Sequence, residues 1–168
     1  RGPQGCMRAY GRASERAGKV RDRRSLGAMC AGLAKAHHLQ GAVELAITNN
    51  QRSLQVFEEL SALDHVACTL DNIAVQYAEL GSKERAKESL ARGARIAIEI
   101  RRDTTLASIK TTEAEITAKT DPAAGLELAQ DALKFARKVD QVDAQVRGLV
   151  LIGELKMKAS GTSARKSF

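Results

Sequence analysis

The sequence is poor in aromatic residues and in proline. Its 168 residues include no Trp, two Tyr, three Phe and two Pro. Ala, Leu, Glu, Lys and Arg make up much of the remainder, and these residues favour helix. The composition therefore predicts an all-α chain, and the length suits one compact domain or a short repeat array.

Long apolar runs are also missing. No stretch approaches the roughly 18 residues that a membrane-spanning helix requires, so we expect no membrane partner. The N-terminal segment is polar and basic without an apolar centre, and it does not predict a signal peptide. Three widely spaced cysteines, Cys6, Cys30 and Cys68, form no CxxC motif. An odd number of cysteines without a disulfide framework is typical of a reducing compartment, so we expect a cytoplasmic protein.

Motifs that would support catalysis or metal binding are absent from the sequence. It contains no Gly-rich phosphate loop, no GxSxG and no HExxH. The histidines His37, His38 and His65 have no Cys, Asp or Glu partner at metal-ligand spacing. We therefore expect no enzymatic activity, no metal and no cofactor.

Positive charge is concentrated at the two ends of the chain, whose net charge is +7. Residues 1–24 contain eight Arg or Lys against two acids, and residues 155–168 contain four Arg or Lys and no acid. The middle of the chain is mildly acidic. The first segment carries a cationic stripe at helical spacing, formed by Arg12, Arg16, Lys19 and Arg23. Docking of an acidic partner is the simpler interpretation of the stripe, and nucleic-acid binding by the basic ends is a weaker alternative.

Small and apolar residues recur along the chain with a long, regular period. The matched pairs are Leu33 with Ile73, Ala34 with Ala74, His37 with Tyr77, Gly41 with Gly81, Ala46 with Ala86, Ser53 with Gly93 and Phe57 with Ala97. A third copy follows with one residue fewer in its turn, where Asp121 is a good N-cap and Pro122 a good first helical residue. Self-similarity at a period of about 40 residues indicates a solenoid of stacked helix pairs.

Periodicity and turn signals together predict eight helices. They lie near residues 5–21, 25–39, 42–61, 64–80, 83–102, 104–119, 122–139 and 143–158. The helices form three repeats, at about 25–64, 65–104 and 105–143, with half-repeats at both ends. We expect a single domain over residues 1–158 and a flexible basic tail over residues 159–168.

The repeat resembles the tetratricopeptide repeat (TPR). The residues that carry the resemblance are Leu70, Ile73, Ala74, Tyr77, Ala86, Leu90 and Gly93. The usual family period is about 34 residues, and the longer period here is similar to that of the repeats in bacterial regulators and in kinesin-light-chain-like adaptors. The resemblance covers about residues 25–143, and the sequence departs from the family in lacking the usual tryptophan near the repeat start. It implies a right-handed superhelix whose first helices line a concave groove for a peptide or helix of a partner protein.

The groove positions that the resemblance implies carry both polar and charged residues. They are Lys35, Asp71, Asn72, Val75, Glu79, Thr111, Thr112, Glu115 and Lys119. Asp71 and Glu115 disfavour the carboxylate clamp of chaperone-binding repeats and favour a partner segment that carries Lys or Arg. We therefore expect a non-enzymatic protein–protein interaction scaffold. The alternative is a sensor or regulatory segment of a larger signalling or transcriptional regulator.

Both ends of the chain have the character of half-repeats. The last expected helix, "AQVRGLVLIGELKMKA", is apolar around more than one face, whereas terminal repeats usually present a polar outer surface. The chain opens on what looks like a second helix, because Ala17 aligns with Ala97 two periods later. We expect either a fragment of a longer repeat protein or a homo-oligomer joined through its terminal helices. The candidate contact residues for self-association are Leu151, Ile152 and Leu155.

Overall fold

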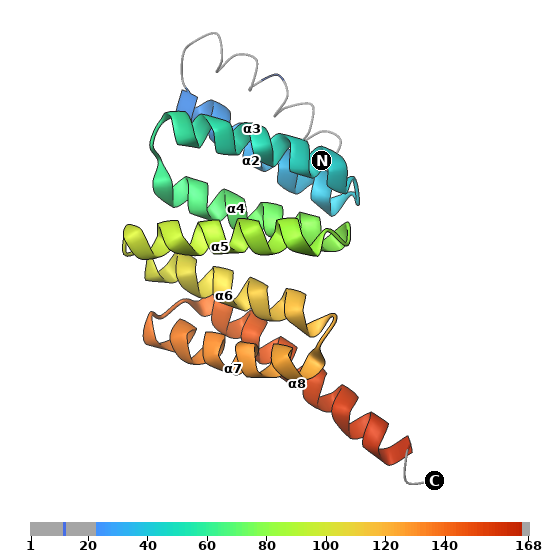
Figure 1. The fold of residues 1–168 in the computed structure, drawn as a ribbon. Coiled ribbons are helices and arrows are strands. Elements are labelled where there is room, and N and C mark those ends of the chain that lie inside the picture. The colour runs from blue at the N-terminus through green and yellow to red at the C-terminus, as the bar shows by residue number, and fades with distance from the viewer. Residues whose placement is uncertain (1–11, 13–22, 166–168) are drawn as a thin grey trace. The chain divides into compact units, whose positions relative to one another are not determined.

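A computed structural model describes residue 12 and residues 23–165 of the chain (Figure 1). The described helices are α2 (Arg23–Leu39), α3 (Val43–Glu59), α4 (Leu63–Glu79), α5 (Lys83–Glu99), α6 (Asp103–Ala118), α7 (Pro122–Lys138) and α8 (Val142–Arg165). No strand occurs in these residues, so the all-α prediction is confirmed. The helix predicted near residues 5–21 lies outside the described residues.

The helices begin at a regular spacing along the chain. Their first residues are Arg23, Val43, Leu63, Lys83, Asp103, Pro122 and Val142. The interval is constant from α2 to α6, is one residue shorter between α6 and α7, and returns to its earlier value between α7 and α8. This spacing confirms the period of the repeat and the residue missing from the third copy. Residues at the same count from the start of their helix are therefore equivalent, and we call this count the helix position.

The turns explain why two glycines match in the repeat. Gly41 and Gly81 each follow the end of a first helix with a φ of 75°, a left-handed conformation that glycine adopts without steric cost. Ser61, Arg101 and Asp140 hold the same conformation after the second helices, with φ values of 49°, 55° and 54°. The turns at Gly41, Ser61, Gly81 and Asp140 each reverse the chain within a few residues and join helices that pack on each other.

The third repeat makes its turn in a different way. No positive φ occurs between α6 and α7, and α7 begins instead on a capped N-terminus. The Asp121 carboxylate accepts hydrogen bonds from the backbone N–H groups of Ala123 and Ala124 at 3.1 and 3.0 Å, and Pro122 is the first helical residue. The predicted cap and helix start are both confirmed.

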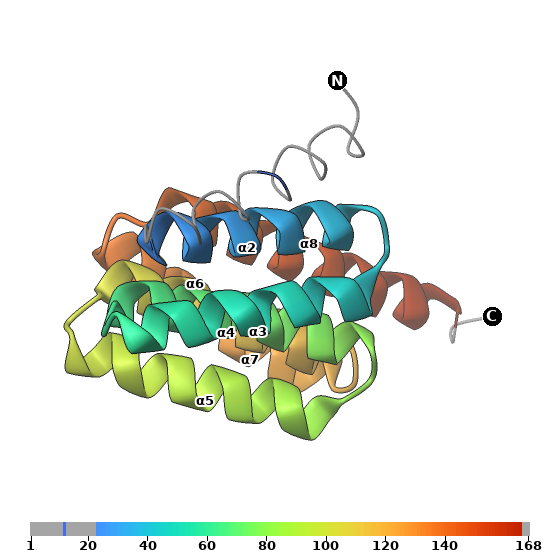
Figure 2. The ribbon, with the colours of Figure 1, turned by 90° about the horizontal axis from the view of Figure 1, so that it is seen from above.

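The chain divides into two compact units, the first ending at Ile100 and the second beginning at Arg101. The sequence predicted a single domain over residues 1–158. In the first unit α2 packs on α3, α3 on α4 and α4 on α5; in the second, α6 and α8 both pack on α7. Figure 2 shows that the helices of each unit run roughly along a common direction. Each unit is thus built of stacked antiparallel helices, as the repeat predicts, and a superhelix through both units stays a prediction.

Alanine occupies the helix crossings. Ala34, Ala74 and Ala114 share helix position 12 of the first helices and are completely buried. The small residues of the second helices are also buried, and they are Ala46, Ala86, Gly93, Ala97, Ala132 and Ala136. Small side chains allow helix axes to approach closely, so the sequence correctly located the core of the repeat.

A polar pair lies inside the contact between α3 and α4. The side chains of Asn50 and Gln76 are each 2% exposed, and Asn50 Nδ2 donates a hydrogen bond to Gln76 Oε1 at 3.1 Å. Asn50 Oδ1 is buried and has no hydrogen-bond partner among the described residues. The pair ties the first repeat to the second by hydrogen bonding as well as by apolar contact.

Helix α8 continues past the point where a tail was predicted. It runs to Arg165 rather than ending near residue 158, and residues 166–168 lie outside the described part of the chain. Residues 159–165 contain no proline, and their single Gly161 costs a helix only about 1 kcal/mol relative to Ala. The end of α8 extends beyond α6 and α7 (Figure 1). None of the described helices combines the length and apolar character needed to cross a bilayer.

Candidate partner-binding groove

The first unit places five of the predicted groove residues on its two first helices. Lys35 lies on α2, and Asp71, Asn72, Val75 and Glu79 lie on α4. Lys35, Asn72 and Glu79 are exposed, whereas Asp71 and Val75 are half-buried. Lys35 and Val75 occupy the same helix position in successive repeats. This surface therefore offers a cation, two carboxylates, an amide and an apolar side chain.

A hydrogen-bonded pair joins the C-terminal ends of these two helices. His38 Nε2 lies 2.8 Å from Glu79 Oε2, and about one third of each side chain is exposed. The sequence analysis did not assign His38 to the groove. The contact joins residues that are 41 apart in the sequence, so no local pattern indicates it. The only feature that could have drawn attention to His38 is its position next to His37. Glu79 therefore already has a partner within the chain.

In the second unit the structure overturns two of the predicted groove positions. Thr111 and Thr112 are 0% and 1% exposed, so neither is displayed to a partner. The Thr111 hydroxyl donates to the backbone oxygen of Ala107 at 3.0 Å. The Thr112 hydroxyl oxygen accepts a hydrogen bond at 2.9 Å from Nη2 of Arg147, which lies on α8. The Thr111 hydroxyl is thus satisfied by the backbone of its own helix, and the Thr112 hydroxyl by a side chain of α8.

Arg147 also engages Glu115 through two hydrogen bonds. Its Nε and Nη2 atoms donate to Glu115 Oε1 and Oε2 at 2.9 and 2.6 Å, and Asp143 Oδ2 lies 3.8 Å from Nη1. The two-pronged geometry is the stronger kind of Arg–carboxylate pair. Arg147 would therefore compete with a basic partner for Glu115. Lys119 follows α6 and is exposed.

Both units therefore tie one first helix to the next by a charged or polar bridge. The bridge is His38–Glu79 in the first unit and Arg147–Glu115 in the second. The groove acids Glu79 and Glu115 therefore hold partners within the chain. The accessible groove is consequently less acidic than its sequence alone indicates.

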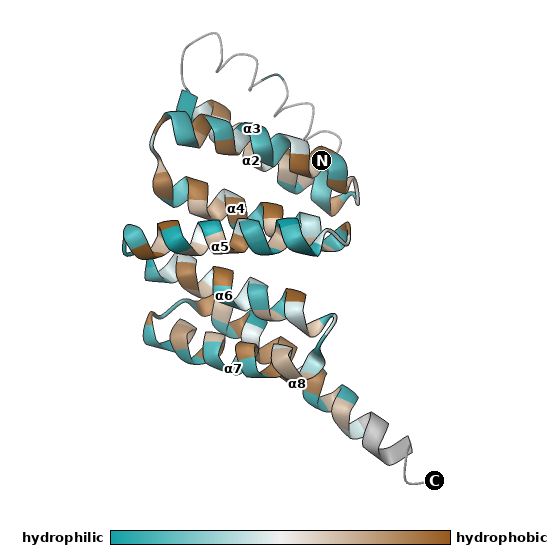
Figure 3. Cartoon of the chain, viewed as in Figure 1, coloured by the Kyte–Doolittle hydropathy of each residue, from teal (hydrophilic) through white to brown (hydrophobic). Residues whose placement is uncertain are grey.

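The candidate self-association residues prove only partly accessible. Leu155 is 7% exposed, so it is wrong as a contact residue, and Leu151 and Ile152 are half-buried. The apolar residues that α8 does expose are Val142, Val146, Leu149, Val150 and Met157. The hydropathy view shows apolar positions along the first part of this helix (Figure 3). The apolar side chains that α8 exposes are thus other residues than the three predicted, and self-association stays a prediction.

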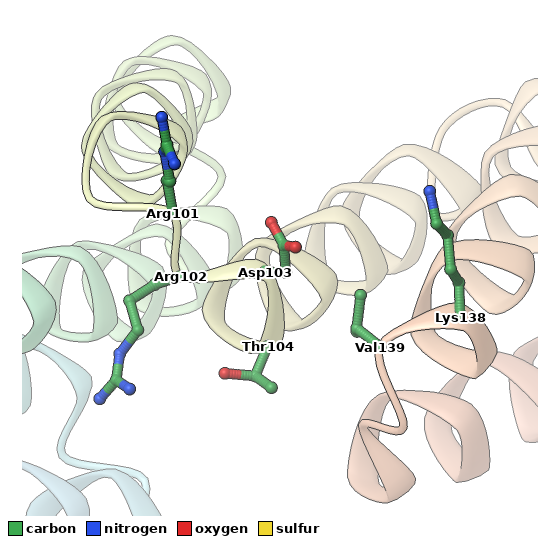
Figure 4. A pocket seen from close by; sticks show the side chains of 6 residues that line it. All are labelled: Arg101, Arg102, Asp103, Thr104, Lys138 and Val139. Atoms are coloured by element: carbon green, nitrogen blue, oxygen red, sulfur yellow. The ribbon is translucent and has the colours of Figure 1, made fainter.

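An open cavity of about 420 Å³ lies between the start of α6 and the end of α7. Its lining residues are Arg101, Arg102, Asp103, Thr104, Lys138 and Val139. The side chains of Arg101 and Arg102 point in opposite directions (Figure 4), so their charges do not converge on one ligand atom. The cavity has no set of donors aimed at a common point and gives no argument for a bound anion.

The histidines, the cysteines and the cationic stripe do not form a binding site within the described residues. In the described part of the chain, no three His, Cys, Asp or Glu side chains gather as metal ligands. Arg12 of the cationic stripe is exposed and Arg23 forms an ion pair with Glu59, while Arg16 and Lys19 lie outside the described residues. Cys30 is buried and Cys68 is exposed, and the two do not form a disulfide with each other.

No family model and no curated protein matches the chain. The resemblance to the TPR family rests on the sequence pattern.

Proposed function

We propose that the chain is a non-enzymatic interaction scaffold of the TPR type. In this proposal the first helices α2 and α4 bind a peptide or helical segment of a partner protein. The observation that supports it is the accessibility of Lys35, Asn72 and Glu79 on two helices whose ends are joined by the His38–Glu79 pair. A surface fixed in this way needs little ordering when it binds, which favours affinity.

The chemistry of the surface indicates what such a segment carries. Lys35 favours an acidic residue, Asp71 and Glu79 favour a basic one, and Val75 favours an apolar side chain between them. Aromatic anchors usually dominate binding energy, and this set of residues contains none. We therefore expect a dissociation constant on the order of micromolar, equivalent to about −8 kcal/mol.

Peptide display on the intact chain would supply a ligand for the test. Isothermal titration would then compare the wild type with Asn72→Lys and Val75→Glu. We expect either change to weaken binding at least tenfold, because each places a charge at the centre of the surface. The matched control is Gln130→Lys, since Gln130 is an exposed amide on the second helix α7. A selected ligand that ignores Asn72→Lys and Val75→Glu, or that responds to Gln130→Lys instead, would refute the proposal.

A further inference from the structure

Helix α8 is covered on one face and open on the other. Ala144, Gly148 and Leu155 are buried, and a Cβ atom on Gly148 would lie 3.5 Å from Leu133 Cβ, so this face packs on α7. The open face carries an apolar stripe at helical spacing. The stripe residues, with their exposed fractions, are Val142 (62%), Val146 (54%), Leu149 (50%), Val150 (55%) and Met157 (69%).

The equivalent face of the other first helices packs on a second helix. In the first repeat, a Cβ atom on Gly27 would lie 2.9 Å from the ring of Phe57. In the third repeat, Ala107 packs in one cluster with Ala136. Both contacts join helix position 5 of a first helix to position 15 of the second helix that follows. Position 5 of α8 is Val146, which has no such helix over it in the described residues.

The C-terminal part of the same face of α8 also lacks a second helix packed on it in the described residues. Position 16 of α6 is Ala118, and a Cβ atom on Gly125, at position 4 of α7, would lie 2.5 Å from its Cα. Position 16 of α8 is the exposed Met157. Position 12, which is a fully buried alanine in all three repeats, is Gly153 in α8, and a Cβ atom there would meet nothing within 4 Å. The open stripe is thus the surface on which a second helix of the repeat would pack.

A second helix of this repeat has a recognisable sequence. Positions 4, 11 and 15 carry small residues, except for Phe57, whose ring packs against Gly27. These residues are Ala46, Ser53 and Phe57 in α3, Ala86, Gly93 and Ala97 in α5, and Gly125, Ala132 and Ala136 in α7. Counting back from Arg23 by the regular interval between helix starts assigns residues 3–19 to the preceding second helix of the repeat pattern. Positions 4, 11 and 15 of this segment are Cys6, Ala13 and Ala17. The segment therefore has the sequence of a second helix.

We propose that α8 of one copy of the chain binds residues 3–19 of a second copy as its second helix. Val146 would then lie against Ala17, a pairing of a large with a small residue that reverses the Gly27–Phe57 contact. The two surfaces are different, so each copy offers one of each and the contact is head to tail. Such contacts allow growth beyond a dimer. The substitutions that test this proposal lie at helix positions 5 and 8 of α8, whereas those that test the groove lie at positions 10 and 13 of α4, so the two proposals stand or fall separately.

Sedimentation velocity of the full chain over a wide range of concentrations tests the association. We expect the wild type to form species larger than a dimer as the concentration rises. The double change Val146→Glu with Leu149→Glu should raise the apparent dissociation constant at least tenfold. Leu45→Glu is the matched control, because Leu45 is 52% exposed on α3 and lies outside the stripe, and it should associate as the wild type does.

A mixing experiment tests the head-to-tail arrangement itself. Ala13→Glu with Ala17→Glu should also give a monomer, because it blocks the other surface. Each blocked variant retains the surface that the other has lost, so an equimolar mixture should form a 1:1 dimer that does not grow. Circular dichroism checks that each variant keeps the helical content of the wild type. If the double change lowers the helical content, Ala17→Glu alone is used in its place.

Three outcomes would overturn the proposal. The first is a wild type that stays monomeric at every concentration, which would mean that α8 is left open or is covered within its own chain. The second is normal association of the Ala13/Ala17 and Ala17 variants, which would indicate that α8 pairs with another α8. The third is association that Val146→Glu with Leu149→Glu leaves unchanged.

Discussion

The first and third helix pairs build the same contact from different residues. At helix positions 5 and 15, the α2/α3 pair has Gly27 against Phe57, while the α6/α7 pair has Ala107 against Ala136. A single aromatic ring fills the space in one pair, and two methyl groups share it in the other. The repeat therefore preserves the register of the contact and its close packing, while the identity of the two residues varies.

Replacing the aromatic ring should break the first pair most severely. Phe57→Ala places an alanine where the third pair has Ala136. Because the facing residue in the first pair is Gly27 and not an alanine, the change leaves a cavity. Phe57 is 2% exposed, and we expect a loss of about 3–5 kcal/mol in the free energy of unfolding. Urea denaturation measures the loss. Ile98→Ala, at a residue that is 61% exposed on α5, should change the stability by less than about 0.5 kcal/mol. Equal effects of the two changes would show that the contact is unimportant.

The shortened α6 predicts an effect specific to the third pair. Position 4 of the second helix is Ala46 or Ala86 in the first two pairs and Gly125 in the third, where a Cβ atom would lie 2.5 Å from the Cα of Ala118. Because the obstacle is backbone, Gly125→Ala should destabilise the protein by about 1–3 kcal/mol, although alanine favours helix over glycine by about 1 kcal/mol.

The control for this change is Gly153→Ala, since a Cβ atom there meets nothing within 4 Å. It should raise the stability by up to about 1 kcal/mol. Thermal unfolding of the two variants in dilute solution measures both effects. Shifts of the same sign would contradict the close approach of α7 to the end of α6.

The smallest expected effect concerns a hydroxyl that only the first of these two pairs possesses. Ser53 Oγ is buried and donates a hydrogen bond to the backbone oxygen of Gly27 at 2.9 Å, whereas the third pair has Ala132 at the same position. Ser53→Ala should cost about 0.5–1.5 kcal/mol. Ser160→Ala is the matched control, because Ser160 is exposed and its hydroxyl donates within its own helix. If Ser53→Ala is as mild as the control, the hydroxyl does not distinguish the two pairs.

The sequence predicted the register of the helices well because register is a local property. The spacing of small residues such as Ala34 and Ala74 follows one helix face, and the turn glycines Gly41 and Gly81 mark positions of positive φ. The missing residue in the third turn was visible in the alignment of the copies. All these signals lie within one or two helices of the residue that they describe.

The sequence failed where burial depends on a side chain from another helix. Thr111 and Thr112 were assigned to the groove from their helix positions, but the chain buries both, and Arg147 of α8 covers Thr112. Leu155 was assigned to an outer surface, although it lies on the buried face of α8 together with Gly148. A helix position gives the direction in which a side chain leaves its helix, but it does not identify the residues of other helices that pack against that side chain.

The buried amide pair between α3 and α4 has a consequence for how the gene could be rearranged. The helix positions of Asn50 and Gln76 are occupied by the buried Ala129 and Leu155 in α7 and α8. Placing α4 after α7 would bury the Gln76 amide without its hydrogen bond, at a cost of about 1–3 kcal/mol, and placing α8 after α3 would do the same to Asn50. Identical repeats can be recombined at any boundary by unequal crossing-over. In this chain the amide pair gives the first two repeats a fixed order, and deletion or duplication of one of them alone would carry an energetic penalty.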